Sequence, residues 1–83
     1  MNSQITKNAL AKVILSIDNK TNYGSSIVRK TKLIYGTVHK ILKKLKQEKL
    51  IEFKKIKRQK IINFTNKGTK LKNLLTEIKQ LWE

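Results

Sequence analysis

Few residues of this chain could carry out proton transfer, metal binding or nucleophilic chemistry. Its 83 residues include one His, His39, five Asp or Glu residues and no Cys. A metal site would need ligands besides His39, and a metal-dependent nuclease would need a group of carboxylates. No Ser or carboxylate constellation accompanies His39 as a nucleophilic site requires. The sequence therefore predicts no enzyme, no metal or cofactor site, and no small-molecule ligand.

Cationic residues dominate instead. Lys and Arg number 20, which gives a formal net charge of +15. Between Arg29 and Lys72 there are 16 basic residues and two acids, Glu48 and Glu52. The bias of an AT-rich genome explains part of the Lys content, but such a bias does not exclude acids. Because this surplus repels itself, it favours an anionic partner: nucleic acid first, with an anionic membrane or an acidic protein as the alternatives.

The length and the apolar pattern limit the remaining possibilities. No apolar run approaches the roughly 20 residues that span a bilayer, and Met1 to Ile5 lack the features of a signal peptide. We expect residues 1–83 to form a single domain with one modest core. Without Cys, a cytoplasmic location, in a host cell or its nucleoid, is expected. A small domain without disulfides often gains stability by oligomerising.

Amphipathic helices must position these cations. The spacing of apolar residues predicts one helix around residues 10–17 and another around 38–45, with the stripes Leu10, Val13, Ile14, Ile17 and Val38, Ile41, Leu42, Leu45. A loop is expected at 18–22. A short helix should follow it, with Ser25 as N-cap and Ile27 and Val28 on its apolar side. A turn at 31–34 then leads into the third helix.

Beyond Leu50 the apolar period changes. Ile51 and Phe53, and later Ile62 and Phe64, alternate with polar neighbours as in half-buried strands. The basic segment 54–60 between them predicts the tip of a hairpin. A last helix, capped by Thr65 or Asn66, carries the apolar stripe Leu71, Leu74, Leu75, Ile78, Leu81 and Trp82. The predicted fold is mainly α with a small β-hairpin (α+β), in the order α-α-α-β-β-α.

From Tyr23 to Gly68 the sequence resembles winged helix-turn-helix DNA-binding proteins, especially MarR-like regulators and small archaeal or archaeal-virus relatives. The segment Leu33–Leu45 is similar to their recognition helix, and Leu50-Ile51-Glu52 to the start of their wing. Phe64-Thr65-Asn66-Lys67-Gly68 is similar to their LT-x-KG element. Two positions depart from the pattern. Lys49 stands where the family usually has Gly, and Ile34 where a Ser or Thr cap is common; both concern helix ends rather than the fold.

The resemblance implies a transcription regulator whose recognition helix enters the major groove of double-stranded DNA. Thr37 can meet a base edge or a thymine methyl, Lys40 a guanine or a phosphate, and Gly36 lets the backbone approach closely. The expected DNA contacts, in the preceding helix, the recognition helix and the wing, are Ser25, Ser26, Arg29, Tyr35, Gly36, Thr37, His39, Lys40, Lys43, Lys44, Lys55, Lys57, Arg58 and Lys60. The alternatives are a solvated helix face and an edge hairpin kept soluble by Lys.

The last helix, about 66–83, is expected to join two copies of the chain, since its stripe is long for so small a core. The alternative is that it folds back on its own domain. A two-fold homodimer would bind a pseudo-palindrome. The predicted function is thus a sequence-specific DNA-binding transcription regulator. A sequence-nonspecific chromatin or nucleic-acid-binding protein remains the alternative, because it would use the same charge without base contacts.

Overall fold

The structure is a computed structural model that describes residues 7–82, with every side chain among them except those of Lys7 and Trp82. The elements, in chain order, are α1 (Lys7–Ser16), α2 (Gly24–Thr31), α3 (Tyr35–Gln47), β1 (Ile51–Ile56), β2 (Gln59–Phe64) and α4 (Asn66–Trp82). The two strands pair antiparallel. This is the predicted order, and it confirms the α+β winged helix-turn-helix fold. In this part of the chain no helix is both long and apolar enough to cross a membrane.

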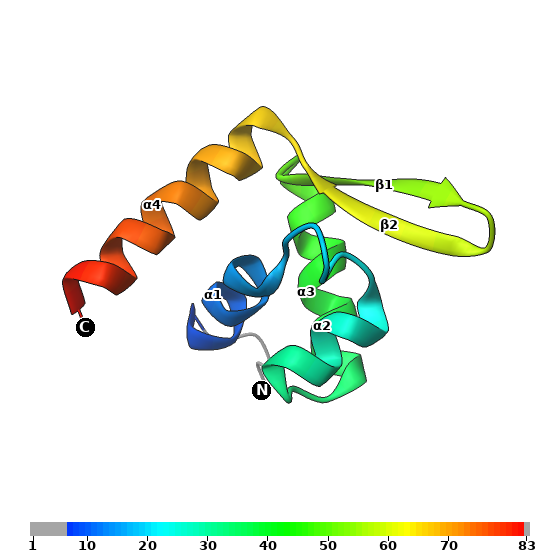
Figure 1. Cartoon of the computed structure of the whole chain (residues 1–83), viewed down its shortest axis with the longest axis horizontal. Coiled ribbons are helices and arrows are strands. Elements are labelled where there is room, and N and C mark those ends of the chain that lie inside the picture. Colours follow the sequence, from blue (N-terminus) through cyan, green and yellow to red (C-terminus); the bar gives the residue numbers. More distant parts are fainter. Residues whose placement is uncertain (1–6, 83) are drawn as a thin grey trace.

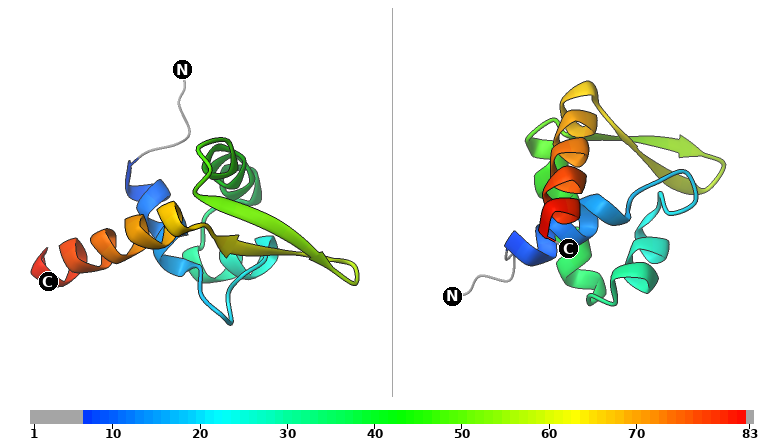
Figure 2. Two further views of the ribbon diagram at one scale, coloured as in Figure 1. Left: turned by 90° about the horizontal axis from the view of Figure 1, so that it is seen from above. Right: turned by 60° about the vertical axis from the view of Figure 1, so that its left-hand side comes forward.

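Helices α1 to α3 form the body of the molecule, from which the hairpin and α4 leave on opposite sides (Figure 1). The end of the hairpin projects beyond the helices. Helix α4 runs past α1, with which it shares contacts, and its start contacts β2 (Figure 2). The hairpin and α4 are therefore two arms on a three-helix core.

Apolar side chains from α1, α2, α3 and the start of β1 fill the core. The fully buried ones are Val13, Ile14, Ile17, Ile27, Val38, Ile41, Leu45 and Ile51. Helical spacing predicted the members from α1 and α3, and strand alternation predicted Ile51. Each contributes roughly 1.5–3 kcal/mol by leaving water. Leu10, expected among them, is only partly buried against the cluster.

Helix α2 begins earlier than the sequence predicted. Tyr23, not Ser25, is its N-cap. The hydroxyl of Ser26 accepts a hydrogen bond from the Tyr23 N–H at 3.3 Å and donates one to the Tyr23 carbonyl at 2.7 Å. The prediction of Ser25 as N-cap is therefore wrong, because the helix end is closed by the side chain at its third position.

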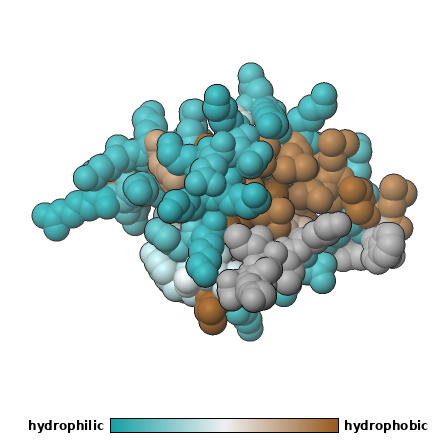
Figure 3. Space-filling model, turned by 180° about the vertical axis from the view of Figure 1, so that it is seen from behind, coloured by the Kyte–Doolittle hydropathy of each residue, from teal (hydrophilic) through white to brown (hydrophobic). Residues whose placement is uncertain are grey.

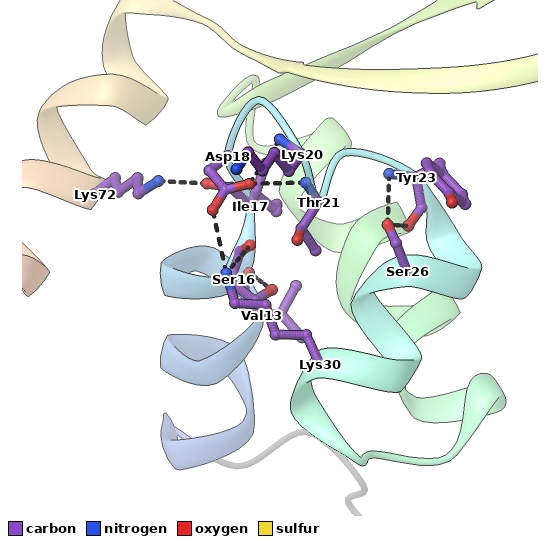
Figure 4. Close-up of polar contacts among 10 residues, drawn as sticks. All are labelled: Val13, Ser16, Ile17, Asp18, Lys20, Thr21, Tyr23, Ser26, Lys30 and Lys72. Carbon is purple, nitrogen blue, oxygen red and sulfur yellow. Dashed lines mark hydrogen bonds and ion pairs between the residues drawn. The ribbon is translucent and has the colours of Figure 1, made fainter.

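The loop between α1 and α2 is organised by Asp18 (Figure 4). One carboxylate oxygen accepts hydrogen bonds from the N–H groups of Thr21 and Lys20 at 2.7 and 2.8 Å, and the other lies 3.1 Å from the Lys30 ammonium. The two backbone N–H groups, followed by Lys30, lower the pKa of Asp18 from 3.8 to about 2. On the other side, the Lys72 ammonium of α4 donates to the Ile17 carbonyl, so that this loop joins three helices.

The passage from α3 to the hairpin explains both the Lys49 departure and the glycine of the LT-x-KG element. Lys49 has φ 62°, the left-handed backbone that favours Gly. Thr65 caps α4: its hydroxyl accepts from the Gly68 N–H at 3.1 Å and donates to the Lys49 carbonyl at 2.7 Å. A Cβ atom on Gly68 would lie 1.8 Å from the Leu50 carbonyl oxygen. Only glycine therefore fits where α4 crosses the end of α3.

The hairpin is longer and tighter than predicted. Its ladder runs from the pair Ile51 and Phe64 to the pair Ile56 and Gln59. The predicted tip at 54–60 shrinks to the two residues that follow Ile56, Lys57 and Arg58, the first with φ 58°. Backbone pairing thus continues beyond the last residues whose alternation marks a strand.

Candidate nucleic-acid interface

Helix α3 turns a polar and basic face outward. Val38, Ile41, Leu42 and Leu45 are buried against the core, and this burial fixes which residues remain outside. Thr37 is half-buried. The predicted contacts that are exposed on this helix are Tyr35, Gly36, His39, Lys40, Lys43 and Lys44. The helix begins without a side-chain cap at Ile34, so the N–H groups of its first turn are left to an outside partner or to water.

Gly36 lies in the first turn of α3, and nothing in the described part of the chain requires a glycine there. A Cβ atom at this position would meet no atom within 4 Å, and the φ angle is not positive. Gly36 thus differs from Gly68, whose place the fold itself explains. The smooth surface at Gly36 instead suits the close approach of another molecule.

A hollow of about 320 Å³ separates α3 from the hairpin. Its floor is apolar, with Leu42, Phe53 and Ile62, and its lysines are Lys43, Lys46 and Lys60. The ammonium groups of Lys60 and Lys46 lie 5.0 and 5.7 Å from the centre of the Phe53 ring, within the range of cation–π attraction. Among residues 7–82, no carboxylate lines the hollow. With these lysines, the hollow is suited to binding an anion.

Tyr35 and His39 form the end of this hollow nearest the start of α3. Their rings are stacked, with centroids 6.3 Å apart and an angle of 20° between the planes. This stacking holds two exposed side chains, one helical turn apart, in a fixed arrangement.

Helix α2 supplies fewer of the predicted contacts. Ser25 and Arg29 are exposed, and the guanidinium of Arg29 donates to the Tyr23 hydroxyl at 3.3 Å. Ser26 is a correction: it is 9% exposed, and its hydroxyl is engaged with the backbone of Tyr23 on both sides. Its hydroxyl caps α2 and is therefore not available to DNA.

The wing, residues 51–64, presents cations at its free end. Lys57 and Arg58 form the tip. Lys55 and Lys60 face each other in the adjoining part of the ladder, and all four are exposed. The acid of the hairpin, Glu52, pairs with Asn63 near the body of the molecule.

The sequence did not point to Lys46 or Phe53 as site residues. Lys46 follows Lys43 by three positions and His39 by seven, and this helical spacing was the available signal. Phe53 gave only a strand signal. Its place beside α3 depends on how the hairpin folds against that helix. Within the described residues, His, Cys, Asp and Glu side chains form no group of three that could hold a metal ion.

Helix α4 carries a second surface, of apolar character. Leu71 and Leu75 pack against the core, whereas Leu74, Ile78 and Leu81 are 49, 55 and 87% exposed. Trp82 ends the helix, and its side chain lies outside the described part of the chain. Figure 3 shows most of the hydrophobic residues of that face gathered on the side where α4 lies. The predicted stripe is therefore divided, and the structure assigns only one edge of it to the core.

No protein-family model and no curated protein matches the sequence. The fold is similar to AF1382 from Archaeoglobus fulgidus, with 25% identity over 95% of this chain and 92% of that one and a TM-score of 0.84. It is similar to MepR, a transcription regulator of the Staphylococcus aureus multidrug efflux pump MepA, with 25% identity over 89% of this chain but 57% of MepR and a TM-score of 0.72. Sso10a-2, a DNA-binding protein from Sulfolobus solfataricus, shares 19% identity over 93% and 81% of the two chains, with a TM-score of 0.70.

The chain is thus a winged-helix protein. Within that class, the arrangement of four helices and one hairpin in residues 7–82 is MarR-like. A MepR variant has been solved bound to an oligodeoxyribonucleotide. The chain spans little more than half of MepR.

Proposed function

We propose that this chain is a transcription regulator that binds double-stranded DNA, with α3 in the major groove and the wing on the backbone or in the minor groove. The observation that carries the proposal is the cation-lined hollow in which the outward face of α3 and the wing meet. The likeness to MepR and Sso10a-2 supports the same reading. In this proposal residues 1–83 act as one domain.

The contacts divide by their chemistry. Tyr35, Gly36 and Thr37, at the start of α3, would lie nearest the base edges, since helices of this kind present their N-terminal residues to them. The hollow would receive the sugar–phosphate backbone, with Lys43, Lys46 and Lys60 around a phosphate. At the wing tip, Arg58 would reach the minor groove, where a narrow groove attracts guanidinium groups. The other proposed contacts are Ser25, Arg29, His39, Lys40, Lys44, Lys55 and Lys57.

We further propose that α4 joins two copies of the chain. Leu71, Leu74, Ile78 and Leu81 follow one another at intervals of three, four and three residues, the a and d positions of a heptad pattern. Three of these four are about half exposed or more. Burying the parts of those three that are exposed gives roughly 1–2.5 kcal/mol for each side chain. A second α4 with the same seam is the simplest partner.

Sedimentation equilibrium tests the dimer. We expect Leu74→Glu with Leu81→Glu to give monomers with weakened affinity for DNA. The matched control is Asn73→Glu with Gln80→Glu, which makes the same change in charge on the polar side of α4 and should leave the dimer intact. Wild-type chains that stay monomeric at tens of micromolar, with and without DNA, would refute it.

A sequence-nonspecific DNA-binding protein is the second candidate. It is favoured by the outward face of α3 itself, where Lys40, Lys43 and Lys44 are natural partners of phosphates. Selection of bound duplexes from a random pool separates the two. A regulator should enrich one pseudo-palindromic sequence, whereas a nonspecific protein should enrich none. Failure to retain any duplex at low salt would refute both.

A further inference from the structure

One apolar side chain stands among the cations at the end of the wing. Ile56 is 48% exposed, and its neighbours in sequence are Lys55, Lys57 and Arg58. It is the last residue of β1, and it pairs with Gln59 immediately before the two-residue tip. A basic hairpin needs no isoleucine there to remain soluble.

The ladder register places Ile56 away from the core. Residues alternate between the two faces of a strand, so Ile56 shares a face with Lys54 and not with Phe53, which lines the hollow beside α3. Ile61 lies diagonal to Ile56 on the same face and is half-buried. Beside Ile61, the side chain of Ile56 remains about half exposed to water. Figure 1 shows this end of the hairpin projecting beyond the helices, and among the described residues no helix covers it.

The surrounding charges determine what Ile56 can meet. Three cations draw the tip to phosphates, and an apolar side chain carried there gains free energy only where it leaves water. In duplex DNA that place is the minor groove, where isoleucine and similar wedges unstack one base step and bend the duplex by about 20–90°. Pyrimidine–purine steps yield most easily to such a wedge.

We propose that the wing bends DNA, with Ile56 as an apolar wedge in the minor groove and Lys57 and Arg58 as its electrostatic anchors. The proposal rests on the proposed function, because it requires the wing to reach a duplex. It adds an activity to that function, because the protein would bend the DNA that it binds.

Fluorescence energy transfer between the two ends of a duplex of about 30 base pairs, with TA steps where the wing tips fall, measures the bend. We expect the wild type and Ile56→Leu to bend it by tens of degrees. Ile56→Gln keeps the length and exposure of the side chain but should leave the duplex nearly straight. It should also bind that duplex about 10-fold or more weakly, since one apolar burial is lost. Arg58→Ala should lower affinity while the complexes that form remain bent.

A pre-bent duplex, in which a short bulge replaces the flexible step, provides a second measurement. Ile56→Gln should bind it more tightly than the straight duplex, because the bend no longer has to be made. A wild-type complex that is straight, or an Ile56→Gln complex bent as much as the wild type, would overturn the wedge while DNA binding stands. Loss of a protein oligomer in Ile56→Gln with an unchanged bend would also overturn it, by assigning Ile56 to a protein contact. A wild type that binds no duplex would remove the proposed function as well.

Discussion

Replacing Gly36 by Ala should raise the stability of the protein. An interior helical glycine is about 1 kcal/mol less favourable than alanine, and the added Cβ would have no atom within 4 Å. Near the helix start we expect about 0.5–1 kcal/mol of stabilisation. For a domain of this size, that corresponds to a rise of roughly 2–8 °C in Tm. Thermal unfolding followed by circular dichroism measures it.

The same methyl group should weaken DNA binding. In the proposed complex Gly36 lies in the first turn of α3, where the backbone approaches the base edges, and a Cβ would push the helix out of the groove. We expect affinity for a selected duplex to fall at least about 10-fold, which is 1.4 kcal/mol in binding. Fluorescence anisotropy at one fixed salt concentration gives the value. The two effects therefore have opposite signs for one substitution.

Asn73→Ala on the exposed side of α4 is the control, because it also improves helix propensity but lies away from α3 and from the free end of the wing. It should raise Tm and leave affinity unchanged. If Gly36→Ala binds DNA as tightly as the wild type, the close approach of α3 at this residue is refuted. If Gly36→Ala lowers Tm, the inference from the open space around Gly36 is itself wrong.

Affinity for DNA should fall by ~10³ or more between about 50 and 200 mM salt, as 6–10 phosphate contacts imply; a flat titration would contradict the electrostatic argument. Lys40→Ala should reduce discrimination between a selected site and random DNA by ~1–3 kcal/mol if Lys40 reads a base. Lys57→Ala should instead lower the affinities for the selected site and for random DNA about equally. If Lys40→Ala also lowers these two affinities equally, Lys40 is a phosphate contact. Because the folded-state pKa of Asp18 lies near 2, below its ordinary value of 3.8, its stabilising contribution is complete above about pH 4 and is lost as the pH falls toward 2. Acid titration of the wild type and Asp18→Asn should therefore differ within that window, and identical profiles would show that Asp18 does not matter to stability.

The sequence predicted those parts of the fold that depend on periodicity. Helical spacing identified the core residues of α1 and α3, and alternation identified Ile51 and Ile62 as buried strand residues. The left-handed backbone at Lys49 could also be anticipated, since the resemblance marks a glycine position there. Periodicity does not show where backbone pairing stops. Strand β1 continues through Lys55 because its hydrogen bonds do not depend on which side chains point outward.

Other details depend on contacts that no sequence pattern encodes. The cap of α2 is closed by Ser26, because the preceding loop turns the Tyr23 backbone toward that hydroxyl. The hollow joins Lys46 of α3 to Phe53 of β1, and this proximity arises only when the hairpin folds beside the helix. Similarly, the stripe of α4 was visible in the sequence, but which edge of it the core would take, at Leu71 and Leu75, was not.

The apolar seam of α4 and the net charge of +15 oppose each other in the proposed dimer. Leu74, Ile78 and Leu81 of both protomers, weighted by their exposed fractions, supply roughly 6–11 kcal/mol on burial. Association alone costs about 4–15 kcal/mol in lost freedom, before the repulsion between two cationic chains. A free dimer should accordingly be weak, and a duplex that neutralises both chains should promote it by mass action. Salt then acts in two directions. It screens the repulsion between charges of the two protomers that lie more than about 8 Å apart at physiological ionic strength and so favours the free dimer. It also weakens the contacts of each protomer with phosphates. A dimer held by ion pairs would instead dissociate as salt rises, so the sign of the salt effect on the free protein distinguishes the apolar seam of α4 from an electrostatic one.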